Sequence, residues 1–183
     1  RGRAIHDLAA QPLTELASFL EKVEFSGVEA PVGEPLVGTL RRRLARLARL
    51  GLGHLDLARE STTLTGGEGQ RIRLAAQAET GLTDQLLVLD EPSIGLHPRN
   101  QEALLATLRE LVEAGNSVVV VEHDESTIRA ADWVVDVGPG AGVEGGRILY
   151  SGPAAPFLAG PPVAESVTQA YLQGRERLPV PPR

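Results

Sequence analysis

The sequence predicts an α/β fold in which a parallel sheet with flanking helices follows a mostly helical subdomain. Two short apolar runs, residues 86–89 and 118–121, each end in charged residues, as buried parallel strands do. Between them, residues 99–114 carry apolar side chains at helical spacing, and Gly115 follows where a left-handed helix end belongs. Strand, helix and strand joined by short loops form a βαβ unit, so the two strands should be parallel.

The composition excludes several classes of protein. The 183 residues fit one domain, or one domain with an appendage. Only 3% are aromatic and the net charge is −6, which excludes base stacking on single strands and a polybasic DNA sleeve as main activities. The chain has no Cys, so it has no disulfides, thiol nucleophile or Cys-based zinc site. No apolar run approaches the roughly 20 residues of a membrane span, and no signal peptide begins the chain. We therefore expect a soluble, cytoplasmic protein, and a fragment, since the chain begins with Arg1 and contains no Met.

The chain is expected to divide into three stretches. Residues 1–80 should form a helical subdomain, 81–150 the α/β half, and 151–183 a C-terminal extension and linker. Apolar residues near the start recur at helical spacing: Leu13, Leu16, Ala17, Leu20 and Val23. A Gly- and Pro-rich loop is expected over residues 27–38. Short strands are expected at 134–137 and 147–150, and the Pro-rich residues after 151 predict a linker.

An arginine-rich helix is expected over residues 40–50. Its leucines form one stripe: Leu40, Leu44, Leu47 and Leu50. The arginines among residues 41–49 cover its other faces, either as a solvated surface or as a phosphate-contacting patch.

Asp90 and Glu91 follow the first predicted strand directly. Ligands bind at the carboxyl ends of strands in open α/β sheets, and a carboxylate there can position Mg²⁺ through water. Asp90 is the candidate for that role, while Glu91 should point to the other side of the strand as a general base. Alone, the same residues could be turn chemistry.

His123 follows the second predicted strand and is a candidate for hydrogen-bonding a terminal phosphate and the attacking water. A capping or core histidine is the alternative.

A third candidate element is Leu-Thr-Gly-Gly-Glu at residues 64–68. Thr65 and Glu68 fit a capping box at a helix start. Gly66 and Gly67 weaken a helix by about 1 kcal/mol each relative to Ala. Their presence predicts a backbone that approaches an anion at the helix N-terminus.

The order of these three elements resembles the ATP-binding-cassette (ABC) ATPases. The resemblance implies that residues 64–68 are the signature motif, Asp90 is the Walker B carboxylate, Glu91 the catalytic base and His123 the switch histidine. Residues 93–97 would be the D-loop. The resemblance also implies that seven residues bind the nucleotide: Thr65, Gly66, Gly67, Glu68, Asp90, Ser93 and Gly95.

Within the ABC ATPases the sequence is similar to the UvrA family, the damage-recognition ATPases of bacterial nucleotide excision repair. The similarity rests on Ser-Ile-Gly-Leu-His at 93–97 and on residues 5–8, 66–74, 121–132, 136–142, 171–175 and 179–181. It implies ATP and Mg²⁺ as cofactors, with zinc in an insertion module of the family that this chain lacks. It also implies four partners and no membrane: a second nucleotide-binding module, a homodimer partner, duplex DNA and a UvrB-type helicase subunit.

Two departures and one absence qualify the resemblance. Thr65 stands where Ser is usual in the family, and Asn100 where Asp is usual. No glycine-rich Walker A loop occurs, and Lys22 is the only lysine. The chain should therefore hold parts of composite ATP sites and be inactive alone. A UvrA-like self-resistance ATPase, a non-catalytic dimerisation scaffold, and a transporter or chromosome-maintenance ATPase are the alternatives.

Overall fold

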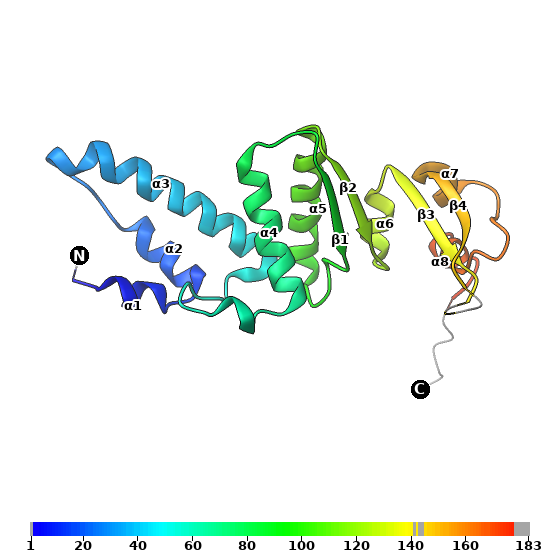
Figure 1. Ribbon diagram of the computed structural model, residues 1–183, viewed down its shortest axis with the longest axis horizontal. Helices are drawn as coiled ribbons and strands as arrows, with labels where there is room; N and C mark the ends of the chain where they lie inside the picture. The colour runs from blue at the N-terminus through cyan, green and yellow to red at the C-terminus, as the bar shows by residue number, and fades with distance from the viewer. Residues whose placement is uncertain (1, 141, 143–144, 178–183) are drawn as a thin grey trace. The chain divides into compact units, whose positions relative to one another are not determined.

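The computed structural model describes residues 2–140, 142 and 145–177, and the chain divides into two units, Arg1–Val121 and Glu122–Arg183 (Figure 1). This division differs from the stretches expected from the sequence, which ended at residues 80 and 150. In the first unit the helical part and the βαβ part share one leucine-rich core. Its members are Leu13, Leu16, Leu20, Leu44, Leu50, Leu52, Leu55, Leu74, Ala75, Leu89, Leu104, Leu108 and Leu111.

The helical part consists of α1 (Ile5–Ala9), α2 (Leu13–Glu21), the 3₁₀ turn η1 (Gly27–Glu29) and α3 (Ala30–Leu47), which is followed by the turn η2 (Ala48–Leu52). The predicted stripe on α2 is confirmed, since its leucines are buried. The loop predicted over residues 27–38 is wrong, because η1 and the first half of α3 occupy it.

Tertiary contacts explain why α3 forms across glycines and prolines. Pro31 lies in the first helical turn, where no intrahelical N–H is needed. A Cβ on Gly33 would lie 2.4 Å from the Phe25 ring, so the glycine makes room for that ring. Arg41 donates from Nε to the Leu20 carbonyl at 3.0 Å, which ties α3 to the end of α2. These contacts favour the helix in a segment of low helix propensity that has Pro35 inside it.

The predicted βαβ unit is confirmed. It consists of β1 (Leu86–Asp90), α5 (Pro98–Glu113) and β2 (Ser117–Val121), and it follows α4 (Gly66–Thr80). The strands are parallel, with Leu86 opposite Ser117 and Asp90 opposite Val121. Figure 1 shows α4 and α5 together on one side of the strands.

The two faces of β1 and β2 differ in exposure. Alternate residues on one face pack into the core: Leu87, Leu89, Val118 and Val120. Those on the other face are 50–67% exposed: Leu86, Val88, Val119 and Val121. The prediction of fully buried strands is therefore wrong for one face within this unit, because none of the unit's described residues packs on that face.

The second unit contains α6 (Glu125–Ala130), β3 (Trp133–Gly138), β4 (Arg147–Pro153), α7 (Ala154–Ala159) and α8 (Val167–Leu172). The two predicted strands are confirmed, and they pair antiparallel. The linker predicted after residue 151 is wrong over α7 and α8, because Phe157 and Gln169 are fully buried there. The Gln169 side chain donates to the Phe157 carbonyl at 2.9 Å, which satisfies a buried amide. The Pro-rich stretch of residues 178–182 lies outside the described residues.

Candidate functional site

The N-terminus of α4 has the predicted capping box. The Thr65 hydroxyl accepts a hydrogen bond from the backbone N–H of Glu68 at 3.3 Å. In return, the Thr65 N–H donates to Glu68 Oε2 at 2.8 Å. These two bonds fix the position at which the helix begins.

The glycines of α4 have different surroundings. A Cβ on Gly67 would lie 3.2 Å from Ile94 Cγ2, so Gly67 permits close packing against the segment after β1. A Cβ on Gly66 or Gly69 would meet nothing within 4 Å. Packing within the chain therefore explains Gly67 and leaves Gly66 and Gly69 unexplained.

A surface hollow of about 380 Å³ lies beside these two glycines. It is lined by Ser61, Leu64, Thr65, Gly66, Gly69, Ile72 and Arg73. The first N–H groups of a helix have no intrahelical acceptor, and they favour negative charge. With Arg73 on its wall, the hollow has the chemistry of an anion site.

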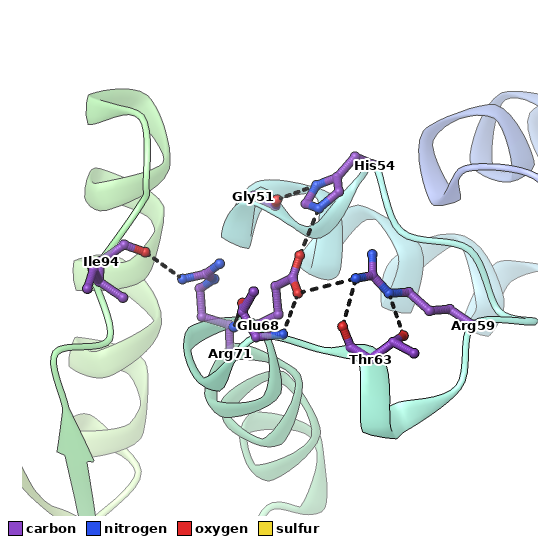
Figure 2. A network of polar contacts seen from close by, with 8 residues as sticks. Gly51, His54, Arg59, Thr63, Glu68, Arg71 and Ile94 are labelled. Carbon is purple, nitrogen blue, oxygen red and sulfur yellow. Dashed lines mark hydrogen bonds and ion pairs between the residues drawn. The ribbon is translucent and has the colours of Figure 1, made fainter.

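Glu68 also joins α4 to the loop before it (Figure 2). Its Oε1 lies 2.9 Å from His54 Nε2, and its Oε2 lies 3.9 Å from Arg59 Nη2. The N–H of Thr65 and then the His54 side chain lower the pKa of Glu68 from 4.5 to about 2. A carboxylate thus held in its charged form anchors both the cap and the loop.

Sequence reasoning missed His54 and Arg59. His54 Nδ1 lies 3.1 Å from the Gly51 carbonyl oxygen, and Arg59 Nε donates to Thr63 at 3.0 Å. A single histidine in a leucine- and glycine-rich turn carries no pattern that would have identified it.

Arg71 connects α4 to the predicted D-loop. Its Nη1 donates to the carbonyl oxygen of Ile94 at 3.3 Å (Figure 2). The same nitrogen donates to the Pro92 carbonyl oxygen, also at 3.3 Å. The residue is only 5% exposed, and its Nε has no hydrogen-bond partner among the described residues. Burial lowers the pKa of Arg71, and the charge of Glu68 opposes that shift. The predicted signature motif and the predicted D-loop are thus brought together through a cation whose role was not predicted.

Asp90 is the last residue of β1, and the segment after it contains two residues with positive φ, Glu91 and Gly95. Asp90 shares the exposed face of β1 with Val88 and is itself exposed. Glu91 has φ 45°, and its N–H donates to the Val121 carbonyl at 2.9 Å. Because Glu91 leaves strand geometry, strand alternation does not set its direction, contrary to the expectation from sequence. A non-glycine residue at positive φ costs about 1–3 kcal/mol and often marks a functional position.

The other two candidates in this segment are placed as follows. Gly95 has φ 71°, which explains its glycine, and the space around its Cβ position is open. Ser93 is buried.

His123 belongs to the second unit, between β2 and α6. It is exposed, so the core interpretation is wrong. The side chain that caps α6 is that of Asp124, which accepts from the Thr127 N–H at 2.9 Å, so the capping interpretation of His123 is wrong too. A functional role for His123 remains a prediction.

The departures from the family pattern have structural surroundings. Asn100 lies against Gly51, where a Cβ would come within 3.0 Å of Asn100 Nδ2. Gly51 has φ 77° and forms the turn that carries His54. Thr65 supplies the capping hydroxyl that Ser would supply.

The described residues contain no group of three or more His, Cys, Asp or Glu arranged to hold a metal ion. Asp90 remains as a single exposed carboxylate. Mg²⁺ keeps most of its waters and binds through one or two carboxylates plus substrate phosphates, so Asp90 fits it. Among the described residues, none of the helices has the length and apolar composition of a membrane span.

Comparison with known proteins identifies relatives over nearly the whole chain. UvrABC system protein A of Thermus thermophilus is 47% identical over 182 residues, which are 98% of this chain and 19% of that protein. The protein of the same description from Vitreoscilla stercoraria is 46% identical over 181 residues, 31% of its length. UvrA2 from Deinococcus radiodurans has a solved structure that matches 97% of this chain and 23% of its own, with a TM-score of 0.86 and 43% identity.

A scan against protein-family models finds no match. The relatives agree with the resemblance that the motifs at residues 66–74, 93–97 and 121–132 indicated. The chain spans about a fifth of the length of the Thermus relative. Over that span it is similar to the UvrA proteins in both sequence and fold.

Proposed function

We propose that this chain supplies the signature, Walker B, D-loop and switch-histidine elements of composite ATP sites in a UvrA-like DNA-damage-recognition ATPase. The observation that carries the proposal is the open N-terminus of α4. Gly66 and Gly69 line the hollow, and a Cβ on either would have no neighbour within 4 Å among the described residues. Nothing in the chain therefore requires glycine at these positions, where glycine weakens a helix. A ligand phosphate in this space accounts for both glycines.

The signature residues would bind a terminal phosphate that is presented by another module. The backbone N–H groups of Gly66 and Gly67 and the Thr65 hydroxyl would donate to its oxygens, with the helix dipole favouring the negative charge. Glu68 would act indirectly, because its carboxylate is used by the cap and by His54.

The segment after β1 would serve the nucleotide of this chain's own module. Asp90 would hold Mg²⁺ through water, and the ion would neutralise phosphate charge. Glu91 would accept the proton of the attacking water, and His123 would hydrogen-bond the terminal phosphate. Ser93 and Gly95 would face the partner module.

The uncovered face of β1 and β2 supports the view that these are partial sites. Leu86, Val88, Val119 and Val121 expose an apolar surface that a folded domain normally covers. We infer that a segment with the Walker A loop covers it, and that the 183-residue chain alone does not turn over ATP. The complete protein would bind duplex DNA, a homodimer partner and a UvrB-type helicase.

The test is Gly66→Asp in the full-length protein that contains this chain. An acid at the first position of α4 interacts favourably with the helix dipole and meets open space, so stability should stay equal or rise by about 0.3–1 kcal/mol. The same charge would repel a phosphate, so kcat for ATP should fall at least about 100-fold, as when an oxyanion-binding donor is lost.

The matched control is Val167→Asp, which places an acid at the first position of α8, after a hydroxyl cap and on an exposed side chain. It should leave ATP turnover unchanged. Full ATPase activity in Gly66→Asp would contradict the proposal and favour the scaffold alternative, in which the signature is only a capped helix.

A further inference from the structure

A histidine in the loop before α4 lies between two hydrogen-bond acceptors (Figure 2). His54 Nδ1 is 3.1 Å from the Gly51 carbonyl oxygen, and His54 Nε2 is 2.9 Å from Glu68 Oε1. A carbonyl oxygen can only accept, so Nδ1 must carry a proton to make the first bond. Nε2 must also carry one if Glu68 is ionised.

The other neighbours of Glu68 keep it ionised. Its Oε2 accepts from the Thr65 N–H at 2.8 Å and lies 3.9 Å from Arg59 Nη2. The bond from Thr65 is the main cause of the low pKa of Glu68, about 2. An ionised carboxylate has no proton to donate to a histidine nitrogen. Both ring nitrogens of His54 therefore face acceptors, and only the doubly protonated imidazolium makes both bonds.

The charge of His54 matters because Glu68 lies in the first turn of α4. A carboxylate beside this helix N-terminus would repel the phosphate that is proposed to bind there. Two cations offset its charge, His54 at 2.9 Å and Arg59 at 3.9 Å. Arginine stays charged in proteins, whereas the charge of a histidine ordinarily changes between about pH 5 and 8.

The groups that face His54 and Glu68 come from three elements. The first turns of α4 also carry Arg71, whose charge interacts with that of Glu68. The loop before α4 contributes Arg59, and η2 contributes the uncharged Gly51 carbonyl. Both arginines keep their charge near neutral pH. Within this set, a change of pH near neutrality therefore acts on His54.

We propose that His54 is a positioning residue for the predicted signature motif, and that its imidazolium form both ties the loop to Glu68 and neutralises that carboxylate beside the phosphate site. Loss of a proton removes one N–H donor and the positive charge, so phosphate binding at α4 weakens as the pH rises. The phosphate in this inference rests on the proposed function, whereas the imidazolium follows from the two hydrogen bonds. The side chain of His54 is 60% exposed, so water screens the charge and the effect is modest.

Nitrogen-15 NMR of the 183-residue chain tests the imidazolium directly. Both ring N–H protons of His54 should be observable at about pH 6, since each is hydrogen-bonded, and they are assigned by their loss in His54→Gln. His6 has a side chain that is 80% exposed, so its ring protons should exchange with water too quickly to be seen. Fewer than two observable ring N–H protons at His54 would overturn the proposal.

ATP turnover by the full-length protein tests the consequence. In His54→Gln the amide can still donate to Glu68 but carries no charge. The ratio of kcat/KM in the parent to that in His54→Gln should be about two to five at about pH 6 and close to one at about pH 8. Groups that titrate in both proteins cancel in this ratio.

Two further variants complete the turnover test. His54→Lys carries a permanent charge and should keep its activity relative to His54→Gln at about pH 8. His6→Gln is the control and should follow the parent. A ratio that is constant with pH would overturn the inference alone if Gly66→Asp is inactive, and the proposed function as well if Gly66→Asp is active. Circular dichroism checks that each variant is folded.

Discussion

The guanidinium of Arg71 donates a hydrogen bond to the carbonyl oxygen of Ile94 at 3.3 Å, which ties the helix of the predicted signature motif to the segment after β1. The same nitrogen reaches the Pro92 carbonyl, also at 3.3 Å. Two parts of the candidate site that are far apart in the sequence are thereby held together by one buried cation.

We expect Arg71→Ala to lower the free energy of unfolding by about 2–3 kcal/mol, because two carbonyls at the base of the loop lose a charged donor. Urea denaturation of the 183-residue chain measures this. Arg73→Ala, which removes an exposed arginine from the same helix, is the control and should change stability by less than about 0.5 kcal/mol. Equal effects would contradict the anchoring role of Arg71.

Glu68 should make stability depend on pH. Its pKa in the folded protein is about 2, below the ordinary 4.5, so its contribution is complete above pH 4.5 and is lost as the pH falls towards 2. Since its partner His54 is 60% exposed, solvent screens the network, and we expect a contribution of about 1–2 kcal/mol. Unfolding of Glu68→Gln and the parent chain, measured from pH 7 to pH 3, should show a gap that narrows with acid. A gap that stays constant would contradict the assignment.

Two glycines of α3 should respond oppositely to alanine. Gly33→Ala would drive a Cβ into the Phe25 ring, 2.4 Å away, so we expect a loss of about 1 kcal/mol or more. At Gly38 the nearest atom to a Cβ is Arg42 Nη1 at 3.7 Å, so Gly38→Ala should gain about 0.5–1 kcal/mol from helix propensity. Thermal unfolding compares the pair. If residues 27–38 were the loop that the sequence suggested, neither change would have this sign.

In the full-length protein, Glu91→Gln should lower ATP turnover about 10²–10⁴-fold while ATP still binds, because only proton transfer is removed. Asp90→Asn should instead weaken Mg²⁺-dependent ATP binding. Equal losses of ATP affinity in both variants would contradict separate roles.

Glu91→Gly should also be inactive, yet it should be more stable than the parent by about 1 kcal/mol, since Glu91 has φ 45°. Turnover assays, nucleotide titration and denaturation separate the three variants.

Removal of the exposed arginine charges of α3 and η2 is expected to leave the affinity for DNA unchanged. Arg41 hydrogen-bonds α2, and Arg43 and Arg46 pair with Glu79 and Glu110. The suitable test is therefore Arg42→Gln with Arg49→Gln, both exposed, in the full-length protein on duplex DNA at several salt concentrations. Each lost phosphate contact would lower the salt slope by about 0.9, and we expect no change. A lower slope would establish a DNA-contacting patch.

Local patterns were sufficient to predict the elements with their own periodicity. The apolar runs at β1 and β2, the leucine stripe of α5 and the capping box at Thr65 depend on neighbours a few residues away. The prediction of a loop over residues 27–38 was wrong because contacts of Phe25 and Arg41 stabilise a helix there. The glycines and prolines alone disfavour that helix.

By itself, the sequence determined the order of the elements, the motifs that resemble those of the UvrA family and the residue types of the candidate site, since these follow from local spacing. Only the tertiary structure decided that Arg71 and His54 support the predicted signature motif. It also decided which glycines face open space, that Glu91 is strained and that one face of β1 and β2 is uncovered. The physical reason is that burial, a shared hydrogen-bond partner and a close approach arise between residues distant in the chain, and no local pattern records them.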